Sequence, residues 1–174
     1  FFKFCHHNSA FMIMTAVLIF PGIVYQKFLL PKMHRWAVNN RTLFYKVYKQ
    51  GNIIMLALGS LAMLVIWLSS EYAYKYIFGY EYIDAIEILK ILSISAPVIF
   101  VASSLGATLV TQEHMKRKVK YMGLAAAINI MLNITLIPSY GAAGAAFATV
   151  ISNMALLATY AIGVKKYVFN DLRH

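Results

Sequence analysis

Acidic residues are scarce in this sequence. The 174 residues include 6 Asp and Glu against 16 Lys and Arg, and charged residues make up only 13% of the chain. A soluble domain carries about 25% charged residues and about 45–50% apolar ones, whereas this chain is 61% hydrophobic. The composition argues against intrinsic disorder, which requires low hydrophobicity, and against an ordinary water-soluble enzyme.

Cysteine and recognisable catalytic motifs are nearly absent as well. Cys5 is the single cysteine, which excludes a disulfide within the chain and a cysteine-based zinc site. The sequence contains no HExxH, GxSxG or Walker motif. The pair His6 and His7 has no carboxylate nearby in the sequence. We therefore expect no enzyme, no metal site and no bound cofactor.

Long apolar runs are what the sequence does contain. Each is long enough, or nearly so, for a helix to cross a hydrocarbon core of about 30 Å, and none alternates like a barrel strand. Because only helices or closed barrels satisfy their backbone in lipid, we expect an all-α polytopic membrane protein with about five transmembrane helices in one membrane-embedded region. The expected spans are residues 10–30, 51–68, 85–110, 121–137 and 142–164.

Basic residues are concentrated in alternate connections between these runs. Thirteen of the sixteen Lys and Arg fall in residues 27–49, 113–120 and 165–174. By the positive-inside rule these connections are cytoplasmic, so the first span runs inwards and the carboxy terminus is cytoplasmic. Orientation and contact with anionic lipid headgroups account for such charge. No stacking platform or groove-reading helix supports a nucleic-acid partner.

Two connections have patterns of their own. In residues 32–50, Trp36, Phe44 and Tyr48 recur near helical spacing, which predicts an amphipathic helix on the inner surface. The outer segment 71–82 is rich in tyrosine. It fits either an aromatic belt at the headgroup level or a sugar-stacking lip on the outer face.

Polar side chains inside the expected spans are candidates for a substrate pathway, because desolvation makes them costly in a membrane. Asn129 and Asn133 lie four residues apart and share one helical face. Ser152 and Asn153 lie near the middle of the last span. These groups either form hydrogen bonds between helices or line a water-filled cavity. We expect Asn129 and Asn133 to face the helix-packed interior.

Charged and helix-breaking residues add further candidates. Glu87 and Lys90 are three residues apart near the outer surface. They form either an ion pair at the membrane boundary or the mouth of a pathway. Pro21 and Pro97 lie inside apolar runs and favour kinks, because proline removes a helix hydrogen bond. Such kinks would act as hinges in a carrier that rocks between two states.

Small residues open the last expected span. They recur at the small-xxx-small spacing that lets two helices approach closely in a membrane. The spacing predicts a tightly packed pair of helices, 121–137 and 142–164, joined by a short outer turn. The residues in question are Gly141 with Ala145 and Gly144 with Ala148.

Several stretches resemble a known family when taken in order. Residues 129–152, beginning at Asn129 and passing Pro138 and Gly141, resemble the signature of bacterial polysaccharide (O-antigen type) flippases. These belong to the multidrug/oligosaccharidyl-lipid/polysaccharide exporter superfamily. Residues 30–32 are similar to the family's cytoplasmic proline after its eighth helix, and residues 78–82 to its outer turn. The resemblance covers residues 19–167.

The resemblance implies twelve spans in the whole protein, of which the five here match the last. It implies a chain that is a carboxy-terminal fragment lacking its amino-terminal lobe, in the bacterial inner membrane. The implied substrate is a polyprenyl-pyrophosphate-linked oligosaccharide, an O-antigen or capsule repeat unit, turned from the inner to the outer leaflet without nucleotide. Further implied partners are other polysaccharide assembly proteins. The alternatives are a related multidrug or cation exporter and a non-transporting membrane fragment.

Overall fold

The structure is a computed structural model that describes residues 30–73, 83–110 and 114–169, together with Ile19 and Ile23. The regular elements of this part are all helices, which confirms the predicted all-α class there. They are α2 (Leu30–Asn39), α3 (Arg41–Ala73), α4 (Ile83–Ser93), α5 (Ser95–Val110), α6 (Met115–Gly163) and a π-helical turn, η4 (Val164–Val168). Several sequence expectations lie outside the described residues: nearly all of span 10–30, its hinge Pro21, the pair His6 and His7, and most of the tyrosine-rich segment.

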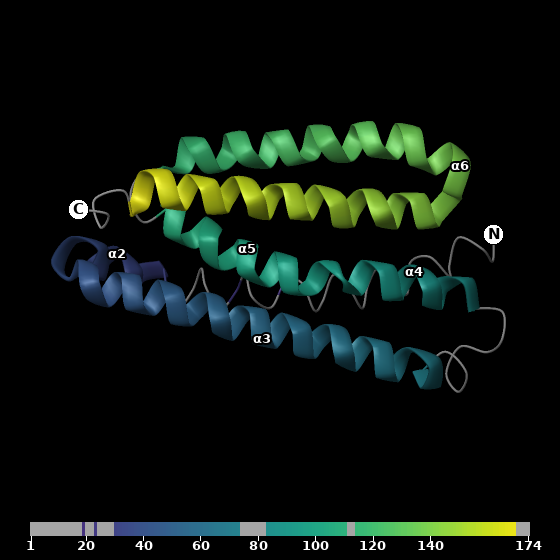
Figure 1. Cartoon of the computed structure of the whole chain (residues 1–174), viewed down its shortest axis with the longest axis horizontal. Helices are drawn as coiled ribbons and strands as arrows, with labels where there is room; N and C mark the ends of the chain where they lie inside the picture. The colour runs from purple at the N-terminus through teal and green to yellow at the C-terminus, as the bar shows by residue number, and fades with distance from the viewer. Residues whose placement is uncertain (1–18, 20–22, 24–29, 74–82, 111–113, 170–174) are drawn as a thin grey trace.

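Three helical segments are long and apolar enough to cross a membrane: Arg41–Ser70, Ile86–Val110 and Met115–Val168. The last contains 54 residues, which would measure about 80 Å if straight. Instead the chain reverses at Gly141, where φ is 55° and ψ is −131°. Only glycine adopts this region without strain. As a result α6 is a hairpin of two antiparallel arms (Figure 1), a first arm (115–140) and a second arm (142–163).

The predicted helical pair with a short connecting turn is therefore confirmed in outline. One boundary was wrong: the first arm does not end before Pro138 but continues through it to the turn. Proline removes one backbone hydrogen bond, and here the helix tolerates that loss in its last turn before Gly141.

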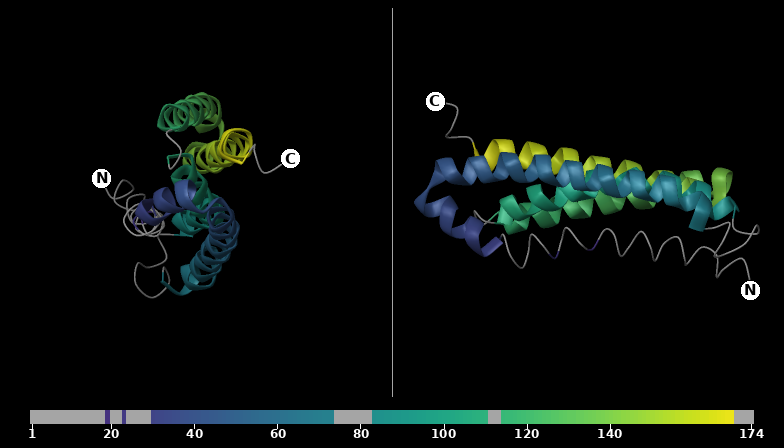
Figure 2. Two further views of the ribbon diagram at one scale, coloured as in Figure 1. Left: turned by 90° about the vertical axis from the view of Figure 1, so that its left-hand side faces the viewer. Right: turned by 90° about the horizontal axis from the view of Figure 1, so that it is seen from below.

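The α4–α5 pair is the centre of the bundle. It packs against α3 on one side and α6 on the other, and the end-on view places the first arm of α6 outermost (Figure 2). The expected span 85–110 is divided at Ile94, whose N–H donates to the Ile91 carbonyl at 3.2 Å. Pro97 has no N–H to offer the carbonyl of Ser93. The kink expected at Pro97 is thus present, three residues upstream; its action as a hinge stays a prediction.

The amphipathic helix expected over residues 32–50 is wrong as a single element. The chain breaks at Asn40, whose Oδ1 accepts a hydrogen bond at 3.0 Å from the Leu43 N–H. Asparagine is a favoured N-cap because its side chain satisfies a free amide of the first turn. Because the chain breaks at Asn40, α2 is a short amphipathic helix, with Met33 and Ala37 buried. It also begins α3 ten residues before the predicted start of span 51–68.

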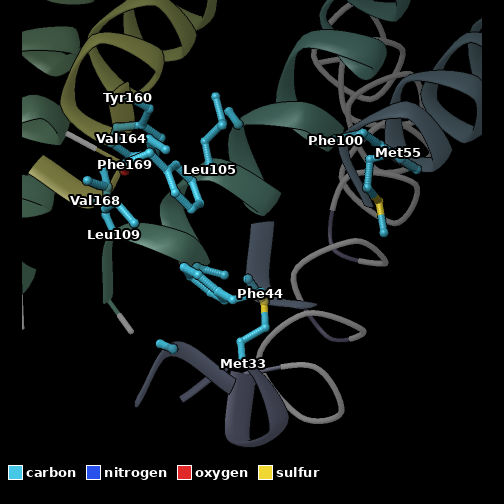
Figure 3. Close-up of a cluster of buried hydrophobic side chains, with 13 residues drawn as sticks. Met33, Phe44, Met55, Phe100, Leu105, Leu109, Tyr160, Val164, Val168 and Phe169 are labelled. Atoms are coloured by element: carbon cyan, nitrogen blue, oxygen red, sulfur yellow. The ribbon is translucent and has the colours of Figure 1, made fainter. Parts of the chain in front are cut away.

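Buried apolar side chains form two clusters. The larger joins α2, α3, α5 and the end of α6 (Figure 3), and its fully buried members include Phe44, Leu109 and Val164. The smaller joins α3, α4, the start of α5 and the second arm. Outside these clusters the long helices expose large apolar residues such as Leu56, Leu68 and Met131. A soluble monomer rarely exposes contiguous apolar surface, so this exposed apolar surface is consistent with helices that cross a membrane.

Candidate functional site

The polar residues of α6 form a chain of hydrogen bonds between its two arms. The Asn133 Nδ2 donates to the Asn129 Oδ1 at 2.8 Å, and the Asn129 Nδ2 donates to the Ser152 Oγ at 3.1 Å. The Ser152 hydroxyl in turn donates to the Thr149 carbonyl at 3.0 Å. Asn129 and Asn133 thus face the other arm, as predicted, and Asn129 joins the arms directly.

This chain agrees with the interhelical interpretation of these residues. Unpaired amides are costly in an apolar medium, and the chain leaves a single group unsatisfied: the buried Asn133 Oδ1 has no hydrogen-bond partner. Asn153 is half-buried next to Ser152, which is itself buried. Whether any of these side chains contacts a transported substrate remains a prediction.

Close packing of the arms depends on Gly144. A Cβ at this position would overlap the carbonyl oxygen of Leu136 and lie 2.7 Å from its carbonyl carbon. Gly144 and Ala148 are both buried, so this small-residue pair lies at a helix contact. Gly141 and Ala145 differ, because Gly141 is exposed at the turn and Ala145 is half-buried. The predicted packing role therefore fits the Gly144 pair better than the Gly141 pair.

A second close approach was missed by sequence reasoning. A Cβ on Gly59 of α3 would lie 2.5 Å from the Pro97 Cα and 3.1 Å from the Ala96 carbonyl oxygen. The two helices therefore touch backbone to backbone at the start of α5, next to the break. The available signal in the sequence was Gly59 itself, a glycine within the uncharged run 51–68. A single glycine does not indicate which helix packs against it.

Glu87 and Lys90, the predicted ion pair or pathway mouth, both lie on α4. Glu87 is exposed and Lys90 is half-buried. The hydrogen bonds near these residues come from α3: the Trp67 Nε1–H donates to the Ser93 Oγ at 2.9 Å and to the Lys90 carbonyl at 3.3 Å. Indole donors usually find a partner when partly buried, so Trp67 fastens α3 to the end of α4.

Positive charge gathers at the other end of the bundle. This end is formed by α2 and by the beginnings of α3 and α6 with η4 (Figure 1). Of the Lys and Arg side chains that the structure describes, all but Lys90 lie at or near it. They are Lys32, Arg35, Arg41, Lys46, Lys49, Lys116, Arg117, Lys118, Lys120, Lys165 and Lys166.

Two of the groups at this basic end cap the last helix. The Arg41 Nη2 donates to the Val168 carbonyl at 2.8 Å, and the His114 Nε2 lies 3.3 Å from the Tyr167 carbonyl oxygen. The final carbonyls of a helix lack intrahelical partners and carry partial negative charge. Arg41 therefore links the start of α3 to the carboxy-terminal end of η4.

Two further cations lie against the ring of Tyr167. The Arg117 guanidinium carbon lies 3.4 Å from the ring centroid and the Lys166 Nζ lies 5.4 Å from it. Both distances are within the range of a cation–π interaction. The Arg117 Nη1 is buried and has no hydrogen-bond partner.

Comparison with protein-family models, curated proteins and solved structures finds no match for this chain. Among the described residues no group of three His, Cys, Asp or Glu side chains is placed to hold a metal ion. The class that the structure supports is accordingly broad: an all-helical protein with helices able to cross a membrane.

A double-mutant cycle on Asn129 and Ser152 tests the link between the arms. We expect Asn129→Ala and Ser152→Ala each to destabilise the chain, with a coupling of about 0.6 kcal/mol, the average for hydrogen bonds between membrane helices. The measurement is reversible unfolding in mixed micelles. Additive losses, with no coupling, would mean that the two side chains do not interact in the folded protein.

Proposed function

We propose that the chain is the carboxy-terminal part of a flippase that moves a polyprenyl-pyrophosphate-linked oligosaccharide across the bacterial inner membrane. In this proposal the bundle crosses the bilayer with its basic end in the cytoplasm. The carboxy terminus then lies on the cytoplasmic side, and the turn at Gly141 lies outside.

The observation that carries the membrane part of the proposal is the segregation of charge along the bundle. Lys and Arg gather at one end, while the helical surfaces beyond that end expose large apolar side chains. Cytoplasmic connections are rich in Lys and Arg, and a lipid environment accepts apolar surface. A water-soluble bundle is not expected to combine a basic end with apolar surfaces exposed along its helices.

The number of spans follows from the same proposal. The two arms of α6 supply two crossings, because an arm of about 25 residues measures about 38 Å, more than the hydrocarbon thickness. With α3 and the α4–α5 pair this makes four crossings. Residues 10–30 supply the fifth, on sequence grounds alone.

The oligosaccharide substrate is supported by the resemblance over residues 19–167 rather than by a bound ligand. The resembling stretch 129–152 coincides with the asparagine–serine chain and the Gly141 turn. In a two-lobed carrier the transport pathway lies between lobes, so this part would supply one wall of it and an amino-terminal lobe the other.

Deletion of the gene tests the transport activity. We expect the lipid-linked repeat unit to accumulate in the inner leaflet and surface polysaccharide to fall, with both effects reversed by the full-length gene. Accumulation is measured by extracting and quantifying the lipid-linked sugar after spheroplast treatment. Gly144→Leu in the full-length gene should fail to rescue, whereas Gly123→Ala, which has no atom within 4 Å of an added Cβ, should rescue fully.

Two results would point to the alternatives. Unchanged lipid-linked sugar together with new sensitivity to cationic drugs would reject the flippase in favour of a drug exporter. Transport by the isolated 174 residues in vesicles is not expected, because one lobe cannot provide both sides of a pathway. If deletion changed neither the lipid-linked sugar nor the sensitivity to cationic drugs, a membrane fragment without transport function would be favoured.

A further inference from the structure

The turn η4 differs from the helix before it in the register of its backbone hydrogen bonds. The Phe169 N–H donates to the Val164 carbonyl at 3.2 Å, and these residues are five apart. An α-helix pairs residues four apart, so η4 contains one residue more than an α-helical turn. Single π-helical turns of this kind are rare and are often found at functional sites.

Phe169, the residue that closes this turn, packs against the start of α3. Its side chain is buried and belongs to the larger apolar cluster (Figure 3). Three aromatic rings of α3 have their centroids 4.8, 5.2 and 5.5 Å from that of Phe169, and they belong to Tyr48, Tyr45 and Phe44 respectively. Aromatic pairs at such distances attract each other beyond the effect of burial alone. The end of the chain's last helix is therefore fastened to α3 by side chains.

Contacts with the neighbouring residues fix the backbone at the same place. The Arg41 Nη2 of α3 donates to the Val168 carbonyl at 2.8 Å. On α6, the Arg117 guanidinium carbon lies 3.4 Å from the centroid of the Tyr167 ring. Residues 167–169 thus each make a contact that depends on the direction in which the π-helical turn orients them.

The α-helical register would not preserve these contacts. The Val164 carbonyl would accept from the Val168 N–H, so that Val168 would occupy the position that Phe169 has in η4. Phe169 would then be rotated about 100° further around the helix axis, which is the step of one residue. Its ring would leave the rings of α3, and the Val168 carbonyl would turn away from Arg41. The contacts with α3 therefore favour the π-helical register over the more common α-helical one.

We propose that residues 164–169 form a two-state latch at the basic end of the bundle. In the π-helical register the latch fastens the start of α3 to the last helix, and in the α-helical register it releases α3. Discrete steps of one element past another are a recurrent form of conformational switching. Because α3 also touches α5 backbone to backbone at Gly59, release would move the start of α3 and leave its middle in place. The inference goes beyond the proposed transport and does not depend on it.

A distance between two spin labels in the full-length protein tests the latch. Lys46→Cys on α3 and Ile162→Cys before η4 supply the labels, since both positions are exposed, with Cys5 and any other cysteine replaced by Ser. Pulsed electron paramagnetic resonance in lipid nanodiscs should give one main, short distance. Arg41→Gln should increase the share of a second, longer distance about tenfold, because a hydrogen bond from a charged donor is lost. The matched control, Lys49→Gln at an exposed position of the same helix, should leave the distances unchanged.

Two further variants separate the change of register from a simple loss of packing. Phe169→Leu keeps an apolar side chain without the ring contacts, and should also increase the share of the longer distance. Deletion of Lys165, which is exposed, leaves Val164 and Phe169 four residues apart. An α-helical turn then keeps Phe169 against α3, so the deletion should give the short distance alone. In this deletion background, Arg41→Gln should no longer lengthen the distance.

Two results would overturn the latch. Unchanged distances in both Arg41→Gln and Phe169→Leu would show that these contacts do not hold the start of α3. A lengthening by deletion of Lys165 as large as that by Arg41→Gln would show that the register of η4 does not control the contact. Both results are independent of whether the protein flips oligosaccharides, so failure of the latch and failure of the flippase assay are separate outcomes.

Discussion

Gly144→Ala is expected to lower the free energy of unfolding by about 2–3 kcal/mol, as overpacking of a close contact does. An added methyl group would overlap the Leu136 carbonyl, and a backbone atom cannot rotate away as a side chain can. The two arms of α6 must therefore move apart, which also lengthens the 3.1 Å hydrogen bond from Asn129 to Ser152. The measurement is reversible unfolding in mixed micelles, followed by helical circular dichroism.

Gly123→Ala is the matched control in the same hairpin. No atom lies within 4 Å of a Cβ at Gly123, so the substitution should stabilise the first arm by up to about 1 kcal/mol through helix propensity. We therefore predict that Gly144→Ala and Gly123→Ala change the free energy of unfolding in opposite directions. Equal stabilisation by both would show that the arms are not in contact at Gly144.

Gly59→Ala is expected to cost a similar amount, about 2–3 kcal/mol. The new methyl group would meet the Pro97 Cα at 2.5 Å, so α3 must shift away from the start of α5. The shift should disturb Trp67, whose indole N–H donates to Ser93 at the adjoining contact between α3 and the end of α4. In a Trp36→Phe background Trp67 is the sole tryptophan, and its emission maximum reports the change.

The control for this second contact lies on the same helix. Ala57 is exposed on α3, and Ala57→Leu adds more volume than a methyl group without meeting α5. It should leave both stability and Trp67 emission unchanged. A destabilisation by Ala57→Leu as large as that by Gly59→Ala would show that the face of α3 that packs on α5 is not the one that contains Gly59.

Much of the architecture is visible in the sequence because membrane helices are defined by length and polarity. Runs 121–137 and 142–164 become the arms of α6, and the run 51–68 lies inside α3. Boundaries are harder, since a helix in such a chain continues past its apolar run until a cap or a turn stops it. Asn40 caps α3 well before residue 51, and Gly141 rather than Pro138 ends the first arm.

The partners of individual residues were less predictable. The four-residue spacing of Asn129 and Asn133 indicates a shared face, and the structure places that face against Ser152. No local pattern could pair Gly59 with Pro97 or Arg117 with Tyr167, because each pair joins segments far apart in the sequence. Such contacts depend on the register between helices, which composition and periodicity do not fix.

The sidedness of the bundle is the central claim, and cysteine labelling tests it most directly. In a background where Cys5, the single cysteine of these 174 residues, and any cysteine elsewhere in the full-length protein are replaced by Ser, Ser139→Cys reports on the α6 turn and Lys116→Cys on the basic end. Both positions are exposed. With a membrane-impermeant maleimide added to spheroplasts, the account predicts that the cysteine at 139 is labelled at once and the cysteine at 116 only after permeabilisation. Labelling of both without permeabilisation, or the reverse pattern, would contradict it.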